Sequence, residues 1–188
     1  MTMQLHQHEQ TAPSAWVCRF AHMIVAGGTV LDLACGRGRH ARYLAGLGYR
    51  VEALDRDSAA LATLEGVAGV ATRCADVEGS PWPYGAGRFD GIVVTNYLHR
   101  PLMGGLLDAL GPGGVLIYET FALGNEKLGR PSNPEFLLRP GELLQWVEGR
   151  FNVLAFEQGL VDQPKPAVIQ RICAAQRGVE DCRLDLSQ

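Results

Sequence analysis

The chain has 188 residues, of which 47% are hydrophobic and 20% charged, and a formal net charge of −3; this is typical of one globular domain that folds alone and excludes a disordered chain. The basic residues are dispersed rather than gathered in a patch, so nucleic-acid binding is not indicated. No apolar run approaches the roughly 18 residues of a membrane-spanning helix, and residues 1–10 lack the features of a signal peptide, so we expect a cytoplasmic protein.

The first half of the chain alternates short apolar strands with helical patterns, which is typical of a parallel sheet with crossover helices. An amphipathic helix is predicted after Ser14, with Trp16, Phe20, Met23 and Ile24 on its apolar face. Strands are predicted at residues 29–34, 50–54, 70–74, 89–95 and 115–119, and helices at 39–46, 59–64 and 101–110. A glycine-rich turn at 111–114 is expected between the last helix and the last strand.

The second half is predicted to close the sheet with an antiparallel hairpin. A loop of about 18 residues, 121–138, is long enough to predict a lid over a functional site. A helix at 140–147 follows, and strands at 151–157 and 168–175 should pair antiparallel because no helix separates them. The predicted fold is therefore α/β, a Rossmann-like doubly wound, mostly parallel seven-stranded sheet. We expect a flexible N-terminus at 1–13, one domain at 14–177 and a flexible tail at 178–188.

The five cysteines form no Cys-x-x-Cys pair, so neither a disulfide framework nor a metal site is predicted, and buried reduced thiols are expected. The residues that indicate chemistry lie instead in the stretch 30–41, where a strand leads through a glycine turn into a helix. Gly36 and Gly38 suit a backbone that bends tightly or approaches a ligand. Asp55, at the end of the second strand, can accept hydrogen bonds from ribose hydroxyls.

Two cofactor classes fit this glycine turn. The first is a nicotinamide or flavin dinucleotide, because Gly36-x-Gly38-x-x-Ala41 satisfies the dinucleotide fingerprint, in which a pyrophosphate lies at the helix N-terminus. S-adenosylmethionine carries no phosphate but has an ammonium and a sulfonium, so its site must supply acids. Asp32 is placed to meet the cationic amino-acid end, and Asp76, just after the third strand, lies beside the adenine. Nicotinamide binding requires neither acid.

Taken together, these motifs resemble the class I S-adenosylmethionine-dependent methyltransferases over roughly residues 28–175. The matching segments are 31–38, 53–55, 75–77, 89–96 and 110–114. Within the class, the compact length and the segment 136–143 are similar to the small tellurite-resistance-type bacterial methyltransferases. The resemblance implies an enzyme that takes S-adenosyl-L-methionine and transfers its methyl group directly.

The resemblance also implies a set of donor-binding positions at the ends of four strands. Asp32 and the two glycines would contact the methionine portion. Asp55 would contact the ribose, and Asp76 with Val77 the adenine. Asn96 would lie near the transferred methyl. The complete predicted set is Asp32, Ala34, Gly36, Gly38, Asp55, Arg56, Asp76, Val77 and Asn96.

The acceptor side of the site is predicted less closely. A hydroxyl or protonated amine needs a base within hydrogen-bond reach, for which Tyr97, His99 and Glu119 are the candidates, whereas a thiolate or tellurite-like anion needs none. The segment 124–134 departs from the class pattern and is assigned to substrate recognition, with Arg130, Asn133 and Arg139 as the predicted substrate contacts.

Four functions follow in order of preference. The first is methyl transfer to a small-molecule or anionic acceptor, and the second is methylation of protein or RNA. A nicotinamide-binding oxidoreductase and a catalytically silent binding module are less favoured. The sequence gives no indication of the oligomeric state.

Overall fold

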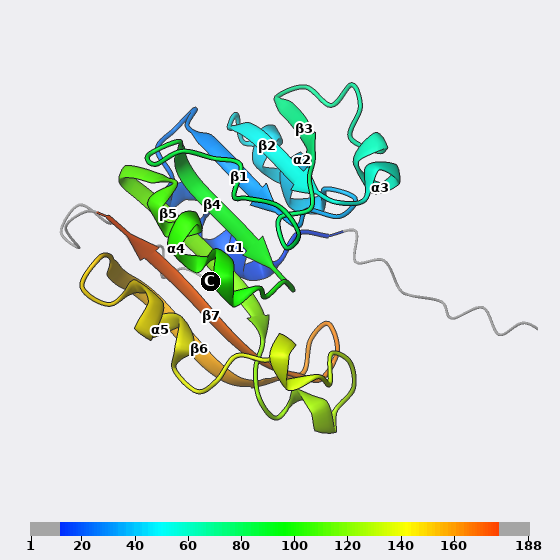
Figure 1. The fold of residues 1–188 in the computed structure, drawn as a ribbon, viewed down its shortest axis with the longest axis vertical. Coiled ribbons are helices and arrows are strands. Elements are labelled where there is room, and N and C mark those ends of the chain that lie inside the picture. The colour runs from blue at the N-terminus through cyan, green and yellow to red at the C-terminus, as the bar shows by residue number, and fades with distance from the viewer. Residues whose placement is uncertain (1–11, 177–188) are drawn as a thin grey trace, which may run out of the picture.

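The computed structural model describes residues 12–176, which form a sheet of seven strands in the order β3-β2-β1-β4-β5-β7-β6 (Figure 1). The first five strands run parallel, and β7 lies antiparallel between β5 and β6. The predicted fold class is confirmed. The strands are β1 Thr29–Leu33, β2 Arg50–Asp55, β3 Val70–Cys74, β4 Phe89–Thr95, β5 Leu110–Phe121, β6 Asn152–Val161 and β7 Ala167–Ala175.

Helices cover both faces of the sheet. They are α1 Ala15–Phe20, α2 Arg39–Gly46, α3 Ser58–Ala62, α4 Met103–Asp108 and α5 Glu142–Val147, with 3₁₀ turns η1 Ala21–Met23, η2 Arg100–Leu102, η3 Asn125–Lys127 and η4 Pro134–Phe136. Successive strand side chains point to opposite faces. Val30 therefore joins the core under α1, α2 and α3, whereas Leu31 joins the core under α4 and α5.

The N-terminal helix is shorter than its apolar pattern predicts. α1 ends at Phe20 and continues only as the η1 turn, yet Ile24 beyond it is still buried. The Ile24 side chain presses on β4, where a Cβ on Gly91 would lie 2.5 Å from Ile24 Cδ1. Glycine at this position of β4 therefore lets the N-terminal segment pack closely on the sheet.

Strand β5 is longer than predicted at both ends. The predicted turn at 111–114 lies inside β5 as an irregularity, where the register with β4 passes from Phe89↔Leu110 to Gly91↔Val115. At the other end β5 continues to Phe121 because β7 pairs with it along its length. The predicted helix at 101–110 is correspondingly shortened to η2 and α4.

Two further predictions concern the termini and the cysteines. The predicted flexible segments 1–13 and 178–188 lie outside the described residues, except for Ala12 and Pro13. Cys35 and Cys173 are buried as expected, but the expectation is wrong for Cys74, which is exposed on the edge strand β3. No helix within residues 12–176 is long and apolar enough to cross a membrane.

Candidate active site

The strand order places a crevice between β1 and β4, where the chain continues to opposite sides of the sheet. In open α/β sheets, ligands bind at the carboxyl ends of the strands at this switch point. Ala34 follows β1 with φ 52°, and Asn96 follows β4 with φ 55°; they are the two non-glycine residues with positive φ within 12–176. Such backbone strain is typical of ligand-binding sites.

The glycine turn after β1 faces this crevice. Gly36 has φ +53°, and a Cβ built on it meets nothing within 4 Å, so the turn presents bare backbone to open space. Gly38 has φ +75°, and a Cβ there would overlap the Leu64 side chain. The first glycine leaves room for a ligand, and the second lets the turn pack on the segment after α3.

Asp32 is the buried acid of the site. Its side chain lies in β1 at 1% exposure, and its Oδ2 has no hydrogen-bond partner. Burial raises the pKa of Asp32 to about 7, although the Ala41 amide and the Arg39 charge oppose this. A buried acceptor without a donor is costly. A ligand ammonium would supply that donor, so this residue fits the cationic end of S-adenosylmethionine.

Asp55 connects the end of β2 to the glycine turn. Its Oδ2 accepts from the Gly36 amide at 2.7 Å, and its Oδ1 accepts from the Asp57 amide at 2.9 Å. A carboxylate has about four lone-pair positions, so both oxygens retain capacity for hydroxyl donors. The half-buried carboxylate is therefore held in place by backbone while still able to accept from a ribose.

The remaining predicted donor contacts lie at the same edge of the sheet. Asp76 follows β3, and its Oδ1 accepts from the amides of Glu78 and Gly79 at 3.0 and 3.3 Å. Val77 beside it is buried, whereas Arg56 is exposed. The structure thus brings the predicted donor set together at the ends of β1, β2, β3 and β4.

A cavity of about 240 Å³ adjoins this edge on the side of β5. It is lined by residues 96–98 after β4, by Thr120 and Phe121 of β5, and by Glu78, Pro131 and Phe136 from the loops. Asn96 is the one member of the predicted donor set in this lining. The cavity therefore adjoins the predicted donor set at Asn96 and extends away from the other members.

The loop predicted as a lid forms one wall of this cavity and is fixed at several points. Asn125 Nδ2 donates to the Pro131 carbonyl at 3.0 Å, and Asn125 Oδ1 accepts from the Val168 amide at 3.2 Å. Arg100 donates to the carbonyls of Glu135 and Leu137 at 2.8 and 2.9 Å. These contacts tie the loop to β7 and to the η2 turn.

Arg100 also forms a bidentate ion pair with Glu142, in which Nε donates to Oε1 at 2.6 Å and Nη2 donates to Oε2 at 2.9 Å. Glu142 is buried and additionally accepts from the Arg139 amide. Burial would raise the pKa of Glu142, but the hydrogen bonds and charge of Arg100 outweigh it and hold that pKa below its usual range. Sequence reasoning missed this pair, whose members are 42 residues apart.

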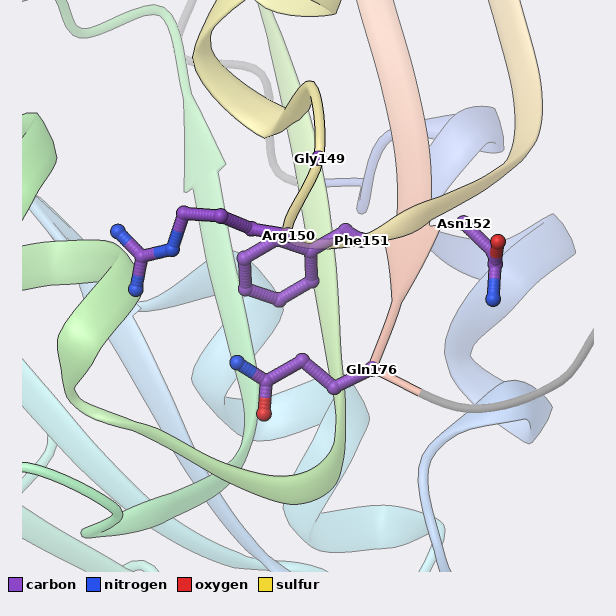
Figure 2. Close-up of a pocket in the computed structure, with 5 residues that line it drawn as sticks. All are labelled: Gly149, Arg150, Phe151, Asn152 and Gln176. Atoms are coloured by element: carbon purple, nitrogen blue, oxygen red, sulfur yellow. The ribbon is translucent and has the colours of Figure 1, made fainter.

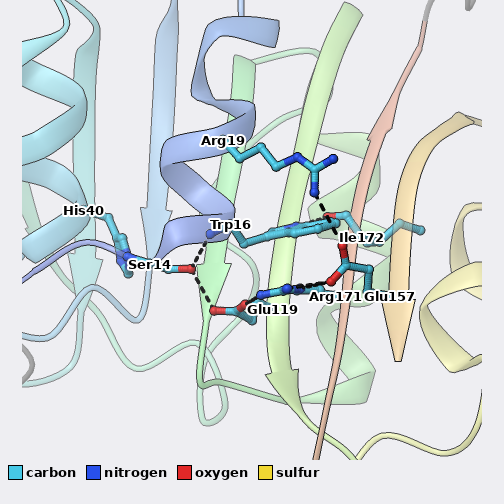
Figure 3. A network of polar contacts seen from close by, with 8 residues as sticks. All are labelled: Ser14, Trp16, Arg19, His40, Glu119, Glu157, Arg171 and Ile172. Carbon is cyan, nitrogen blue, oxygen red and sulfur yellow. Dashed lines mark hydrogen bonds and ion pairs between the residues drawn. The ribbon is translucent and has the colours of Figure 1, made fainter. Parts of the chain in front are cut away.

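The three predicted bases occupy different environments. Tyr97 lines the cavity, and burial with the charges of Glu78 and Asp76 raises its pKa, so the phenol stays protonated. Glu119 Oε1 accepts from the Ser14 hydroxyl at 2.8 Å, and its Oε2 from Arg171 at 3.0 Å (Figure 3). His99 is half-buried and does not line the cavity.

A polar cluster that the sequence did not predict lies beside Glu119. His40 lies beside Ser14 (Figure 3), and its Nε2 accepts from the Ser14 amide at 3.1 Å. Its Nδ1 lies 3.4 Å from the Thr95 hydroxyl. Burial, assisted by the Arg39 charge, lowers the pKa of His40 to about 3, so the ring is neutral and can accept from an amide. The cluster fixes the start of α1 at the carboxyl edge of the sheet.

We expect Ser14→Ala to lower the free energy of unfolding by about 1–2 kcal/mol, because Ser14 is the N-cap of α1 as well as the donor to Glu119. Urea denaturation measures the change. Ser58→Ala, at the exposed first position of α3, is the control and should cost much less. Equal losses in the two variants would contradict the role given to Ser14.

The predicted substrate contacts do not reach the cavity. Arg130, Asn133 and Arg139 are exposed and absent from the lining, where Pro131 and Phe136 represent this part of the chain. Asn133 instead caps the η4 turn, its Oδ1 accepting from the Glu135 amide at 3.0 Å. Pro131 and Phe136 were missed because neither side chain carries a charge or an obvious chemical role.

A larger hollow of about 570 Å³ lies elsewhere, lined by Gly149, Arg150, Phe151, Asn152 and Gln176 (Figure 2). Gln176 follows β7 and pairs with Gly114 near the start of β5, so this hollow is at the opposite edge of the sheet. None of the predicted site residues lines it, and its Arg150 is paired with Asp108 at 2.6 Å.

Within 12–176 there is no group of three or more His, Cys, Asp or Glu side chains that could hold a metal.

Comparison with known proteins finds a methyltransferase domain in part of the chain. Residues 30–114 match the family model described as a methyltransferase domain. A curated relative, the protein-L-isoaspartate O-methyltransferase of Chlorobaculum tepidum, is 34% identical over 115 residues, covering 55% of this chain and 50% of that protein. The chain thus spans half the length of the curated relative it matches.

Solved structures agree on the fold. TehB from Haemophilus influenzae has a TM-score of 0.69 at 21% identity, covering 84% of this chain and 60% of that one. A Burkholderia thailandensis 1,6-didemethyltoxoflavin-N1-methyltransferase, solved with bound 1,6-didemethyltoxoflavin and S-adenosylhomocysteine, has a TM-score of 0.64 at 21% identity, covering 91% of this chain and 80% of that one. The predicted methyltransferase domain is confirmed over residues 30–114, and the predicted fold over most of the chain.

Proposed function

We propose that this chain, a class I S-adenosylmethionine-dependent methyltransferase by its domain over residues 30–114, transfers the methyl group to a small-molecule acceptor. The observation that carries the proposal is the cavity of about 240 Å³ beside Asn96, which has room for about eight water molecules of ~30 Å³ each. It is smaller than the roughly 300–1,000 Å³ of pockets that hold drug-sized ligands. An acceptor of this bulk can lie next to the donor crevice.

Each donor-binding role rests on a contact described above. Asp32 would hold the amino group of the donor through its unpartnered Oδ2. The backbone at Gly36 would face the methionine portion, and Asp55 would accept from the ribose. When bound, S-adenosylmethionine supplies a methyl group on a positively charged sulfur. Asn96, at the junction of crevice and cavity, would face the methyl group.

The protein's part in the reaction is alignment and exclusion of water. Holding a nucleophile in line with a reacting carbon can supply several kcal/mol, about 7–11 at its upper range. The cavity wall formed by Phe121, Pro131 and Phe136 is apolar and fixed by the loop contacts, so it suits this task. Tyr97, as a protonated phenol, can form a hydrogen bond with the acceptor but does not serve as a base.

Of the two acceptor types predicted from the sequence, the cavity supports the small molecule and not the anion. Arg130 and Arg139, the side chains expected to hold an anion, lie outside its lining. A second candidate function is methylation of a protein, which is favoured by the exposed apolar side chains Leu123, Leu128 and Phe136 of the loop. A small peptide segment seated on these side chains would reach the same cavity.

Asp55→Ala tests the donor site. We expect the dissociation constant for S-adenosylmethionine to rise roughly tenfold to a hundredfold, because the variant loses both the ribose acceptor and the bond that holds the Gly36 amide. Isothermal titration calorimetry measures the constant. Asp57→Ala is the matched control, since it removes only the cap of α3 and should cost about 1 kcal/mol of stability without changing donor affinity. Unchanged affinity in Asp55→Ala would contradict the ribose role.

A further inference from the structure

The cavity at the ends of β4 and β5 has an unusual charge balance. Its aromatic side chains are Tyr97, Phe121 and Phe136, and Glu78 is the one side chain in the described lining that is charged at neutral pH. Aromatic rings attract cations through their faces, and a carboxylate attracts them directly. The lining therefore favours a positive charge and disfavours a negative one.

The arginines nearest to the cavity do not reverse this balance. Arg100 is committed to Glu142 and to two loop carbonyls. Arg130 precedes Pro131 but is exposed and outside the lining. Arg56 affects the Tyr97 phenol electrostatically from the end of β2, yet it is also exposed and outside the lining. Glu78 is exposed as well, but of these charged side chains it is the one that lines the cavity, so it acts on a bound ligand at the shortest range.

The Tyr97 hydroxyl adds a second observation. Its oxygen is buried and makes no hydrogen bond of ordinary geometry, although Glu78 and Asp76 are close enough to act on it electrostatically. Buried hydroxyls are normally paired. A polar group of an acceptor in this cavity would give the hydroxyl a partner.

We infer that this cavity binds a small organic amine in its cationic form, with Glu78 as its counter-ion and the rings of Phe121 and Phe136 against its apolar body. The inference rests on the proposed function and names its acceptor class. It assigns to Glu78, Phe121 and Phe136 a part in recognising the acceptor, which the sequence motifs did not indicate. The same carboxylate disfavours the binding of carboxylates and oxyanions in the cavity.

The reaction balances for such an acceptor. The bound ammonium first gives one proton to the Glu78 carboxylate, which frees the nitrogen lone pair. The nitrogen then forms a bond to the methyl carbon as the carbon–sulfur bond breaks and its electron pair returns to sulfur. The products are an N-methylammonium and neutral S-adenosylhomocysteine, and the proton on Glu78 passes to solvent.

The test uses three probes of nearly equal size: phenethylamine, 2-phenylethanol and phenylacetate. Binding of each is measured by calorimetry at pH 7.5 to the full chain saturated with S-adenosylhomocysteine, so that the donor site is filled and no turnover occurs. We expect phenethylamine to bind at least about tenfold more tightly than phenylacetate, with 2-phenylethanol between them, because one charge-assisted pair is gained or lost. Glu78→Gln should weaken phenethylamine about tenfold and leave 2-phenylethanol unchanged. Glu148→Gln, an exposed glutamate after α5, is the control and should change neither.

Several outcomes would overturn the inference. Phenylacetate binding as tightly as phenethylamine, or an unchanged preference in Glu78→Gln, would remove the counter-ion role. Amine binding to the free chain but not to the chain saturated with S-adenosylhomocysteine would assign the cavity to the donor. Absence of binding by all three probes, or binding only by a larger peptide, would refute a small amine as acceptor. If S-adenosylhomocysteine itself does not bind, both the proposed function and this inference fail. If it binds and the amine does not, this inference fails alone.

Discussion

Asp32→Asn is expected to make the protein more stable at pH 8 while weakening its hold on the donor. Burial raises the pKa of this carboxyl from 3.8 to about 7, so ionising it in the folded state is unfavourable. A difference of about 3 pKa units corresponds to a penalty on the order of 4 kcal/mol. An asparagine keeps an acceptor for the Ala41 amide but carries no charge, and the penalty disappears.

The sign of the pH dependence follows from proton uptake. Between about pH 4 and pH 7 the folded protein keeps the Asp32 proton while the unfolded chain has lost it, so the Asp32 contribution to stability falls as pH rises through this window and is constant above it. Urea denaturation at pH 5 and pH 8 measures the difference in free energy of unfolding between wild type and variant. The contributions of the other titrating groups cancel in this difference. Asp162→Asn, in the exposed turn between β6 and β7, is the control. A stability difference that does not change between the two pH values would contradict the buried charge.

The same carboxyl links donor binding to protons. If the donor's ammonium pairs with ionised Asp32, binding at pH 6 must release a proton, and the affinity must rise with pH until about pH 7. Calorimetry in two buffers of different ionisation enthalpy counts that proton. Asp32→Asn should bind the donor more weakly and release none from this position. Proton release that persists in the variant would assign it to another group.

Arg100→Ala is expected to have the second largest effect, a loss of about 3 kcal/mol in the free energy of unfolding. Removing one member of a buried ion pair leaves the other charge uncompensated, which typically costs about 3–5 kcal/mol, and Arg100 is itself partly exposed. The substitution also removes the donors to the Glu135 and Leu137 carbonyls. The loop 121–138 should then become sensitive to limited proteolysis before the rest of the protein.

The Glu142 carboxyl provides the control for this prediction. Its lowered pKa in the folded protein means that its ion pair stabilises the fold above the carboxyl's usual pKa of 4.5, and that this contribution is lost as pH falls through the lowered value. The difference in free energy of unfolding between wild type and Arg100→Ala should therefore be smaller in acid than at neutral pH. Arg100→Lys keeps the charge but not the planar fork, so it should recover part of the loss. A deficit equal at pH 4 and pH 7.5 would show that packing, not charge, dominates.

The parts of the site that sequence reasoning predicted are those encoded within a few residues. The glycine turn, Asp32 and Asp55 lie next to strand ends, and the parallel sheet brings strand ends to one edge without further information. The cavity wall depends on pairs far apart in the chain, such as Asn125 with Val168, 43 residues away. No local pattern encodes such a pair.

The same reason explains the loop that was predicted as a lid. Its length and glycines indicate a functional segment, and two of its residues, Pro131 and Phe136, do line the cavity. The loop is held by hydrogen bonds from Arg100 of the η2 turn and from the Val168 amide of β7. Neither contact can be inferred from the sequence of the loop itself. The charged residues of the segment were predicted as substrate contacts, whereas its apolar residues form the cavity wall.

The place of β7 has a consequence for biosynthesis. β7 is the last strand of the described residues 12–176, yet it lies between β5 and β6. Its residues Val168, Gln170 and Arg171 bond to the loop, to α5 and to Glu119. A nascent chain can pair β1 to β5 before β7 has been translated, but the contacts of β7 with the loop cannot form until then. The strand ends that carry the glycine turn, Asp55 and Asp76 can therefore form before the cavity wall that β7 supports.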